Sequence, residues 1–545
     1  MRPLNSACWL LVAGLLASSG ELLSAQTGVE RERWREIARQ VGHIMERGDR
    51  TERIAKVEEL VAEGHPFCAR LIARGIAVSH QRSQRMDRRT SDALARNAEL
   101  YARLKIQPPQ NKGDRTKNDE INANLDLVDR LQELGAEERA FRREAVVRIR
   151  KLVDSMSGDN REILAKDVLG ELGGAKGEYR MALLDVAGRI PLPQTLDAAI
   201  LVAQSDRDQV LRLTAIDALG ESGEERAAEG LVAVLRDPRW QLRVAVVEAL
   251  RKLRKKAAIP ALIEAMGREE GRVREDILAA LQDMTGVDKS DNPAVWRNWW
   301  EENQDKPLAA QAARPAPRPG HHPAAARRPQ GGGGRAAGGG WANRQGGAGA
   351  TSFYGIETKS KHIVYILDHS GSMQLPASAG DRTGGEGTAG LTKIEVAKNE
   401  LWKSIQALPA DATFNILFYN HAYTVFRDRM IGASPANKQA AKEYIDGIVA
   451  DNRTNIYDTL QRAFEIGGQG AVDKEYKVNF DTIFFLTDGS PTTGKTTDWR
   501  EILAEVEHWN KAKRIKVHCV GIGPHNSAFL HGLAAQTGGE YTTRG

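Results

Sequence analysis

Three oxygen-bearing side chains at alternate positions are the first candidates for chemistry in this sequence. Asp368, Ser370 and Ser372 directly follow the apolar run 363–367, whose β-branched and large side chains predict a buried parallel strand. In open α/β sheets, ligands bind beyond the carboxyl ends of the strands, where this loop would lie. A carboxylate and two hydroxyls supply the oxygen ligands that Mg2+ prefers. The stretch therefore predicts a site for a hard divalent cation.

Two later segments strengthen this prediction. Thr454 lies in a loop that leads into an apolar-periodic helix, and Asp488 lies in a Thr-Asp-Gly sequence directly after the apolar run 482–486. This order of motifs resembles the von Willebrand factor type A domain and its metal-ion-dependent adhesion site, over residues 353–545. The resemblance implies a metal set of five residues, Asp368, Ser370, Ser372, Thr454 and Asp488. It also implies bound Mg2+ or Mn2+, with one coordination position open for an Asp or Glu carboxylate of a protein partner.

The pattern around these motifs predicts an α/β domain. Apolar strand-like runs alternate with helix-like periodicity, which is typical of a doubly wound, Rossmann-like parallel sheet with helices on both faces. A short run at 422–427 follows the strand 413–419 so closely that it predicts an antiparallel edge hairpin. The stretch 373–392, rich in Gly, Ser and Thr, lengthens the loop after the first motif.

A second motif competes inside the same domain. Residues 489–496 match the G-x-x-x-x-G-K-T pattern of a phosphate-binding loop after a strand. Pro491 removes one backbone donor, and the next helix is expected to begin near Trp499, beyond Lys495 instead of at it. A P-loop nucleotide hydrolase is therefore a less favoured alternative. No nucleophile–base–acid set emerges elsewhere, so we expect no enzyme.

Before this domain the sequence repeats itself. Similar apolar-periodic segments begin at Arg180, Arg212, Arg243 and Arg274, with steps of 31 or 32 residues between them. A period of this length with a second helix in each unit predicts an all-α solenoid, and the pattern resembles HEAT-type repeats. Solenoids commonly bind proteins along one surface, so we expect a second interaction surface here. The tryptophan-rich segment 294–300 is expected to cap the array.

The whole chain of 545 residues is too long for one core. Its 77 basic and 72 acidic residues nearly cancel, so net charge says little about partners. The Arg- and Gly-rich stretch 307–350 could contact nucleic-acid phosphates, but the expected export and the lack of aromatic residues other than Trp341 argue against a nucleic-acid partner. The apolar segment 8–17 is too short to span a bilayer and is typical of a signal peptide. After its removal two distant cysteines remain, which form no disulfide framework.

Five segments follow from these observations. They are a signal peptide (1–25), a helical region of unassigned role (26–140), the HEAT-like solenoid (141–304), a Pro-, Ala-, Arg- and Gly-rich linker (305–352) and the metal-binding domain (353–545). We expect an exported, metal-dependent protein-binding or adhesion protein without a transmembrane segment, located in the periplasm, on the cell surface or outside the cell. A bacterial envelope is the favoured address. The main alternative is a metal-independent structural scaffold of an envelope assembly.

Overall fold

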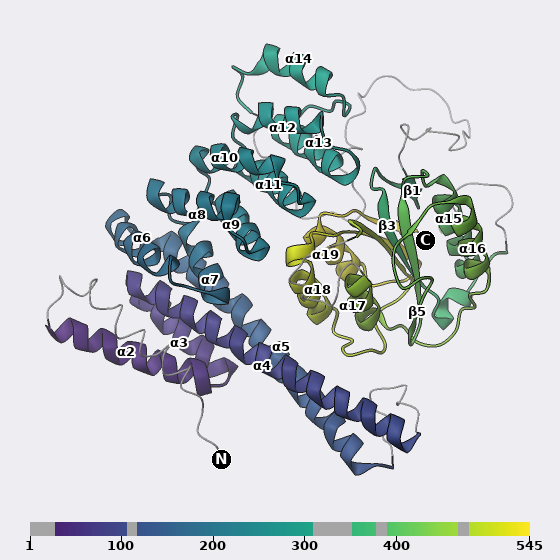
Figure 1. Cartoon of the computed structure of the whole chain (residues 1–545), viewed down its shortest axis with the longest axis horizontal. Coiled ribbons are helices and arrows are strands. Elements are labelled where there is room, and N and C mark those ends of the chain that lie inside the picture. Colours follow the sequence, from purple (N-terminus) through teal and green to yellow (C-terminus); the bar gives the residue numbers. More distant parts are fainter. Residues whose placement is uncertain (1–27, 106–116, 309–350, 378–389, 467–478, 545) are drawn as a thin grey trace, which may run out of the picture. The chain divides into compact units, whose positions relative to one another are not determined.

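The computed structural model describes residues 28–105, 117–308, 351–377, 390–466 and 479–544 (Figure 1). The chain forms two compact units, residues 1–235 and residues 236–545. The predicted signal peptide and most of the predicted linker lie outside the described residues. Among the described helices, none combines the length and the apolar character needed to cross a bilayer.

The described part of the first unit is helical. The two long helices α4 and α5 pack against each other, and a buried ion pair joins Arg53 of α3 to Glu138 of α5 at 2.6 Å. The expected boundary between residues 140 and 141 falls inside α5, so the structure does not divide the chain there. The helices of this unit are α2 (Gly28–Arg47), α3 (Arg50–Glu63), α4 (Pro66–Leu104), α5 (Asp119–Ser155), α6 (Gly158–Leu172), α7 (Gly177–Ala187), α8 (Pro193–Ser205), α9 (Gln209–Glu221) and α10 (Glu225–Val232).

Helical repeats continue into the second unit as α11 (Trp240–Leu253), α12 (Ala258–Met266), α13 (Gly271–Thr285) and α14 (Pro293–Asn303). The repeated sequence segments form α7, α9, α11 and α13, which confirms the predicted solenoid. The terminal helix α14 packs on α12. Its Trp296 is fully buried and donates from Nε1 to the Ser290 carbonyl at 2.8 Å, as a capping helix requires.

The rest of the second unit is an α/β domain. Its sheet has the order β5-β4-β3-β7-β8-β9, and among the described strands of this sheet only β5 and the short β6, both paired with β4, run antiparallel. This confirms the predicted doubly wound sheet and its edge hairpin. The strands are β3 (His362–Asp368), β4 (Thr413–Tyr419), β5 (Tyr423–Val425), β6 (Ile431–Gly432), β7 (Thr482–Thr487), β8 (Lys516–Ile522) and β9 (Tyr541–Arg544). A separate hairpin of β1 (Thr351–Phe353) and β2 (Ile356–Thr358) precedes the sheet and was not predicted.

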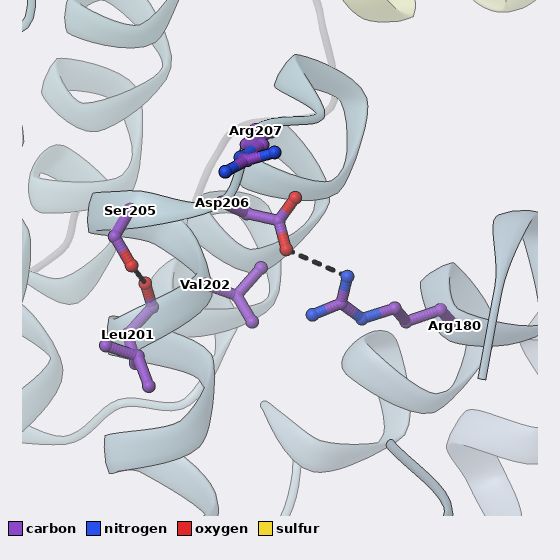
Figure 2. A pocket seen from close by; sticks show the side chains of 6 residues that line it. All are labelled: Arg180, Leu201, Val202, Ser205, Asp206 and Arg207. Atoms are coloured by element: carbon purple, nitrogen blue, oxygen red, sulfur yellow. Dashed lines mark hydrogen bonds and ion pairs between the residues drawn. The ribbon is translucent and has the colours of Figure 1, made fainter. Parts of the chain in front are cut away.

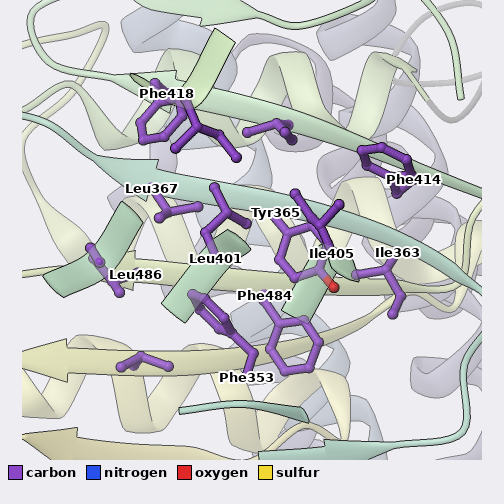
Figure 3. Packing of buried hydrophobic residues seen from close by; sticks show 14 of the residues in the cluster. Phe353, Ile363, Tyr365, Leu367, Leu401, Ile405, Phe414, Phe418, Phe484 and Leu486 are labelled. Atoms are coloured by element: carbon purple, nitrogen blue, oxygen red, sulfur yellow. The ribbon is translucent and has the colours of Figure 1, made fainter. Parts of the chain in front are cut away.

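Helices cover both faces of this sheet because the central strands are apolar on both sides. In β3, Tyr365 and Leu367 face a core with α15 (Lys393–Ala407) and α16 (Pro435–Asp446). The alternate residues Val364 and Ile366 face α17 (Ile456–Ile466), α18 (Trp499–Lys513) and α19 (Ser527–Thr537). Figure 3 shows the first core, where the ring of Tyr365 stacks on Phe484 at a centroid distance of 5.7 Å. Two packed faces fix the sheet and thereby the loops at its edge.

Within the second unit, α13 contacts residues at the amino ends of the parallel strands. Lys516, the first residue of β8, bonds Glu275 at 2.8 Å and Asp276 at 2.7 Å. Arg272 donates to the carbonyl of Asp481, just before β7, at 2.7 Å. These contacts lie at the end of the strands opposite to the predicted metal loops, whose residues follow the carboxyl ends of β3 and β7.

Candidate metal site at the carboxyl edge of the sheet

Asp368 forms the base of the candidate site. It ends β3, is fully buried, and accepts hydrogen bonds from the backbone N–H of Ser370 at 2.8 Å and from Oγ1 of Thr487 at 2.7 Å. Because β3 and β7 are adjacent parallel strands, their last residues meet at one edge, which places the Thr-Asp-Gly segment beside the first motif. The two motifs are 119 residues apart in sequence and in direct contact in space.

A chain of hydroxyls links the first motif to Asp488. The Ser370 and Ser372 hydroxyls lie 3.2 Å apart, and Ser372 donates to Oδ1 of Asp488 at 2.7 Å. Asp488 is buried, whereas Ser372 is exposed. The site is therefore carboxylate-lined at its base and open to solvent at Ser372.

The fifth predicted residue, Thr454, lies in a loop that is bonded to the first motif. Gly371 N–H donates to the Asn452 carbonyl at 2.9 Å, and Asp451 N–H donates to the His369 carbonyl at 2.8 Å. Thr454 itself is buried, and its N–H donates to Oγ1 of Thr492 at 2.8 Å. The structure thus brings the loops of all five predicted residues together. Hydrogen bonds link four of these residues in a chain that runs from Asp368 through Ser370 and Ser372 to Asp488.

Burial has the largest effect on the pKa of Asp368 at the bottom of the site. Desolvation raises the pKa of Asp368 to about 6, although the hydrogen bonds from Ser370 and Thr487 favour its ionised form, and the nearby Asp488 charge raises it further. The other carboxylate, Asp488, is paired with the ammonium of Lys393, whose Nζ lies 2.8 Å from Oδ2. Sequence reasoning missed Lys393, because a single lysine at the start of an amphipathic helix carries no pattern of its own.

The donor set fits a hard divalent cation. It consists of two carboxylates and three hydroxyls, all oxygen, and no sulfur or imidazole ligand belongs to it. Within the described ranges, no three His, Cys, Asp or Glu side chains gather elsewhere as an alternative metal centre. Mg2+ at this set stays a prediction.

The G-K-T loop has a different role in the structure. The N–H groups of Thr492 and Thr493 donate to the Thr454 carbonyl at 2.9 and 3.3 Å, so these donors do not face outward to phosphate. Lys495 donates to the Tyr457 hydroxyl at 3.0 Å, and α18 begins four residues later at Trp499. The loop therefore supports the segment that carries Thr454, which disfavours the phosphate-binding alternative.

A hollow of about 400 Å3 in the first unit is a second place where a ligand can be sought (Figure 2). Its charged lining is Arg180, Asp206 and Arg207, and Arg180 is paired with Asp206 at 2.8 Å. The remaining lining is Leu201, Val202 and Ser205. No cluster of catalytic or metal-ligating residues lines it, so we assign it no chemistry.

Comparison with known families matches the solenoid to HEAT repeats over residues 167–251, 196–282 and 228–313. Among curated proteins, inter-alpha-trypsin inhibitor heavy chain H4 from Homo sapiens is 29% identical over 187 residues, covering 34% of this chain and 18% of that protein. Heavy chain H1 from Sus scrofa is 30% identical over 149 residues, covering 27% of this chain and 14% of that protein. The chain thus spans less than a fifth of the length of these relatives.

Two solved structures share similarity with about a third of the chain. A von Willebrand factor type A protein from Catenulispora acidiphila is 22% identical, with a TM-score of 0.27. The match covers 34% of this chain and 39% of the chain of that protein. A mutant form of the PilB minor pilin from Streptococcus sanguinis is 13% identical, with a TM-score of 0.24. The match covers 33% of this chain and 56% of the pilin chain. The chain therefore contains HEAT repeats over residues 167–313, and the strand order and motif residues of its C-terminal α/β domain are similar to those of a von Willebrand factor type A domain.

Proposed function

We propose that this chain is an exported protein-binding or adhesion protein whose α/β domain recruits a partner through a divalent cation. Mg2+ or Mn2+ is held by Asp368, Ser370, Ser372, Thr454 and Asp488, and the partner supplies an Asp or Glu carboxylate. The helical repeats provide a second interaction surface. In this proposal the protein is a binding protein and not an enzyme.

The observation that carries the proposal is the assembly of an oxygen-only donor set at the carboxyl edge of the sheet, with one exposed member. Asp368 and Asp488 are nearly inaccessible to solvent, whereas Ser372 is exposed. A ligand group can therefore approach from the Ser372 side without displacing the carboxylates. Solenoid repeats supply an extended surface for a second protein.

When bound, the cation supplies a positive centre that attracts a carboxylate oxygen. The protein residues hold the cation in position. Neutral hydroxyls cancel none of the positive charge of a cation, so a ligand set rich in hydroxyls leaves the ion electrophilic toward a carboxylate oxygen. The hydrogen bonds that fix Asp368 and Thr454 keep these donors in place before any partner arrives.

Calorimetric titration of the purified full chain with Mg2+ and Mn2+ tests the metal site. Wild-type protein is expected to bind one cation, and the double variant Ser370→Ala, Ser372→Ala is expected to lose this binding at least tenfold. Ser352→Ala removes an exposed serine hydroxyl from β1 and serves as the matched control. If the wild type does not respond to either cation, the metal-dependent function is wrong and the scaffold alternative gains.

Export is the second part of the proposal, and it is supported by the apolar segment 8–17 of the sequence. Expression with the native amino terminus in a bacterial host, followed by fractionation and amino-terminal sequencing, tests it. Mature protein that begins near Gln26 in the periplasm or the medium supports export. Full-length protein retained in the cytoplasm contradicts it.

A further inference from the structure

A buried lysine contacts the candidate metal site and has no role in the five-residue set. Lys393 is the first residue of α15, and its side chain is only 7% exposed. Its Nζ lies 2.8 Å from Oδ2 of Asp488, while Oδ1 of the same carboxylate accepts from Ser372. The two oxygens of Asp488 are thus divided between a fixed ammonium group and the hydroxyl side of the site.

The surrounding backbone leaves room for this side chain. Gly523, after the end of β8, has a φ of +56°, and a Cβ there would lie 3.1 Å from Lys393 Nζ. Any larger residue at that position would be strained and would crowd the ammonium group. The lysine is therefore enclosed between Asp488 and the turn after β8.

The position of the Lys393 ammonium group at the start of α15 is electrostatically unfavourable. The first turn of a helix carries partial positive charge, which favours acidic residues and disfavours lysine there. Burial of an ammonium group adds a desolvation cost, and the ion pair with Asp488 offsets both.

Charge counting shows what the lysine changes. Asp368 and Asp488 contribute two negative charges when both are ionised, and Lys393 contributes one positive charge. A bound divalent cation therefore leaves this group of residues with one net positive charge, whereas a neutral residue at position 393 would leave none. Because two positive centres share Asp488, they also repel each other across a buried, weakly screened space.

We propose that Lys393 is a positioning residue of the metal site that orients Asp488, weakens cation binding through its charge and keeps the loaded site positive toward an anionic partner. This inference rests on the proposed metal-dependent function. It assigns Lys393 a measurable effect on cation affinity that is opposite in sign to the effect of removing a ligand. A lysine that only stabilises the fold has no such effect.

Calorimetry of the full chain with Mg2+ distinguishes these roles. Lys393→Met and Lys393→Gln remove the charge, and Gln keeps a donor for Asp488; both are expected to bind Mg2+ at least fivefold more tightly. Lys393→Arg keeps the charge and is expected to stay within threefold of wild type. Lys398→Met, on the same helix but bonded to the Asp446 and Ile448 carbonyls, is the matched control and is expected to leave the affinity within twofold.

Each other outcome has a defined meaning. Equal or weaker Mg2+ binding by folded neutral variants overturns the charge role of Lys393 while leaving the metal site intact. Failure of both neutral variants to fold, judged by circular dichroism and thermal unfolding, makes Lys393 a structural residue and also overturns the inference. Absence of Mg2+ binding by the wild type removes the proposed function itself, and the inference with it.

Discussion

His518 shows at the level of one residue how burial in this sheet controls protonation. It lies in the middle of β8, is 1% exposed, and stacks on Phe484 at a centroid distance of 5.1 Å. Its Nδ1 accepts from the Glu540 N–H at 3.1 Å. Desolvation lowers the pKa of His518 to about 3, and the positive charges of Lys516 and Arg272 act in the same direction. The negative charge of Glu275 opposes this shift.

This shift makes the stability of the domain depend on pH. Below about pH 6.5 the unfolded chain binds a proton at position 518 that the folded chain does not bind until about pH 3. The unfolding free energy should therefore fall by about 1.4 kcal/mol for each pH unit on acidification through this window. His518→Gln, which cannot be protonated, should lose this part of the slope.

Urea unfolding of both proteins at pH 7, 6 and 5 measures the effect. The difference in unfolding free energy between wild type and His518→Gln should shift in favour of the variant as the pH falls from 6 to 5. A difference that stays constant over this range would show that His518 is protonated in the folded protein. The absolute stability of the variant does not enter this comparison.

The candidate site illustrates what single residues reveal from sequence. Asp368, Ser370, Ser372 and Asp488 could be named because their order and spacing form a motif, and the structure joins them by hydrogen bonds of 2.7 to 3.2 Å. Lys393 could not be named, because its role depends on where α15 begins relative to β7. Motifs are local in sequence, but the partner of a buried charge is chosen by the packing of elements.

At the scale of elements, the segment between β7 and α18 holds the loop that carries Thr454. Gly494 has a φ of +111°, and a Cβ there would lie 2.3 Å from Oδ1 of Asn455. Gly494→Ala should therefore displace either this segment or Asn455, at a stability cost of about 1–3 kcal/mol. Since Thr492 and Thr493 bond Thr454, Mg2+ binding should weaken as well.

Calorimetry and thermal unfolding of Gly494→Ala check this prediction. Gly489→Ala is the matched control, since a Cβ at Gly489 has no neighbour within 4 Å. Wild-type cation affinity and stability in Gly494→Ala would mean that the segment does not position Thr454. A comparable loss in Gly489→Ala would point to a general sensitivity of this loop.

The terminal helix α14 gives a prediction for the repeats. Trp296→Ala removes a fully buried side chain and the hydrogen bond to Ser290, which should cost about 3–5 kcal/mol. Val295→Ala, at a position 37% exposed on the same helix, should cost less than about 1 kcal/mol. Chemical unfolding followed by circular dichroism compares the two, and equal losses would show that α14 does not cap the array through Trp296.

At the scale of the whole molecule, the second unit joins repeat helices to the α/β domain through partly buried ion pairs. Burial alone would raise the pKa of Glu275, but Lys516 and the Lys359 N–H stabilise its ionised form and lower the pKa to about 2. Lys516 is buried as well, and it also bonds Asp276. These pairs connect residues about 240 positions apart in sequence.

Removing the lysine should destabilise this unit. Lys516→Met takes away the cation that Glu275 and Asp276 share, at a cost of about 1–3 kcal/mol, because Asp276 keeps its ion pair with Arg272 and Glu275 keeps the hydrogen bond from Lys359 N–H. Lys511→Met, at an exposed position of α18, should have little effect. Urea unfolding of the two variants tests the prediction, and similar stabilities would show that the pairs contribute nothing measurable.

The sequence by itself determined the class of each domain. Repeats of 31 or 32 residues predicted the solenoid, and alternating strand and helix patterns predicted the doubly wound sheet, because burial imposes its periodicity on the local sequence. The strand 413–419 appears with its predicted bounds, and the apolar run 482–486 lies within β7. The hairpin of β1 and β2 was missed, since three-residue strands are too short to carry a period.

Only the tertiary structure decided how these elements meet. It assigned the G-K-T loop to the support of Thr454, continued α5 across an expected domain boundary, and paired Lys393 with Asp488 and Lys516 with Glu275. Each of these outcomes depends on contacts between residues far apart in the chain. A single sequence encodes the preference of each segment for helix or strand, whereas the partner of a buried polar group is fixed only when the segments pack and water is excluded.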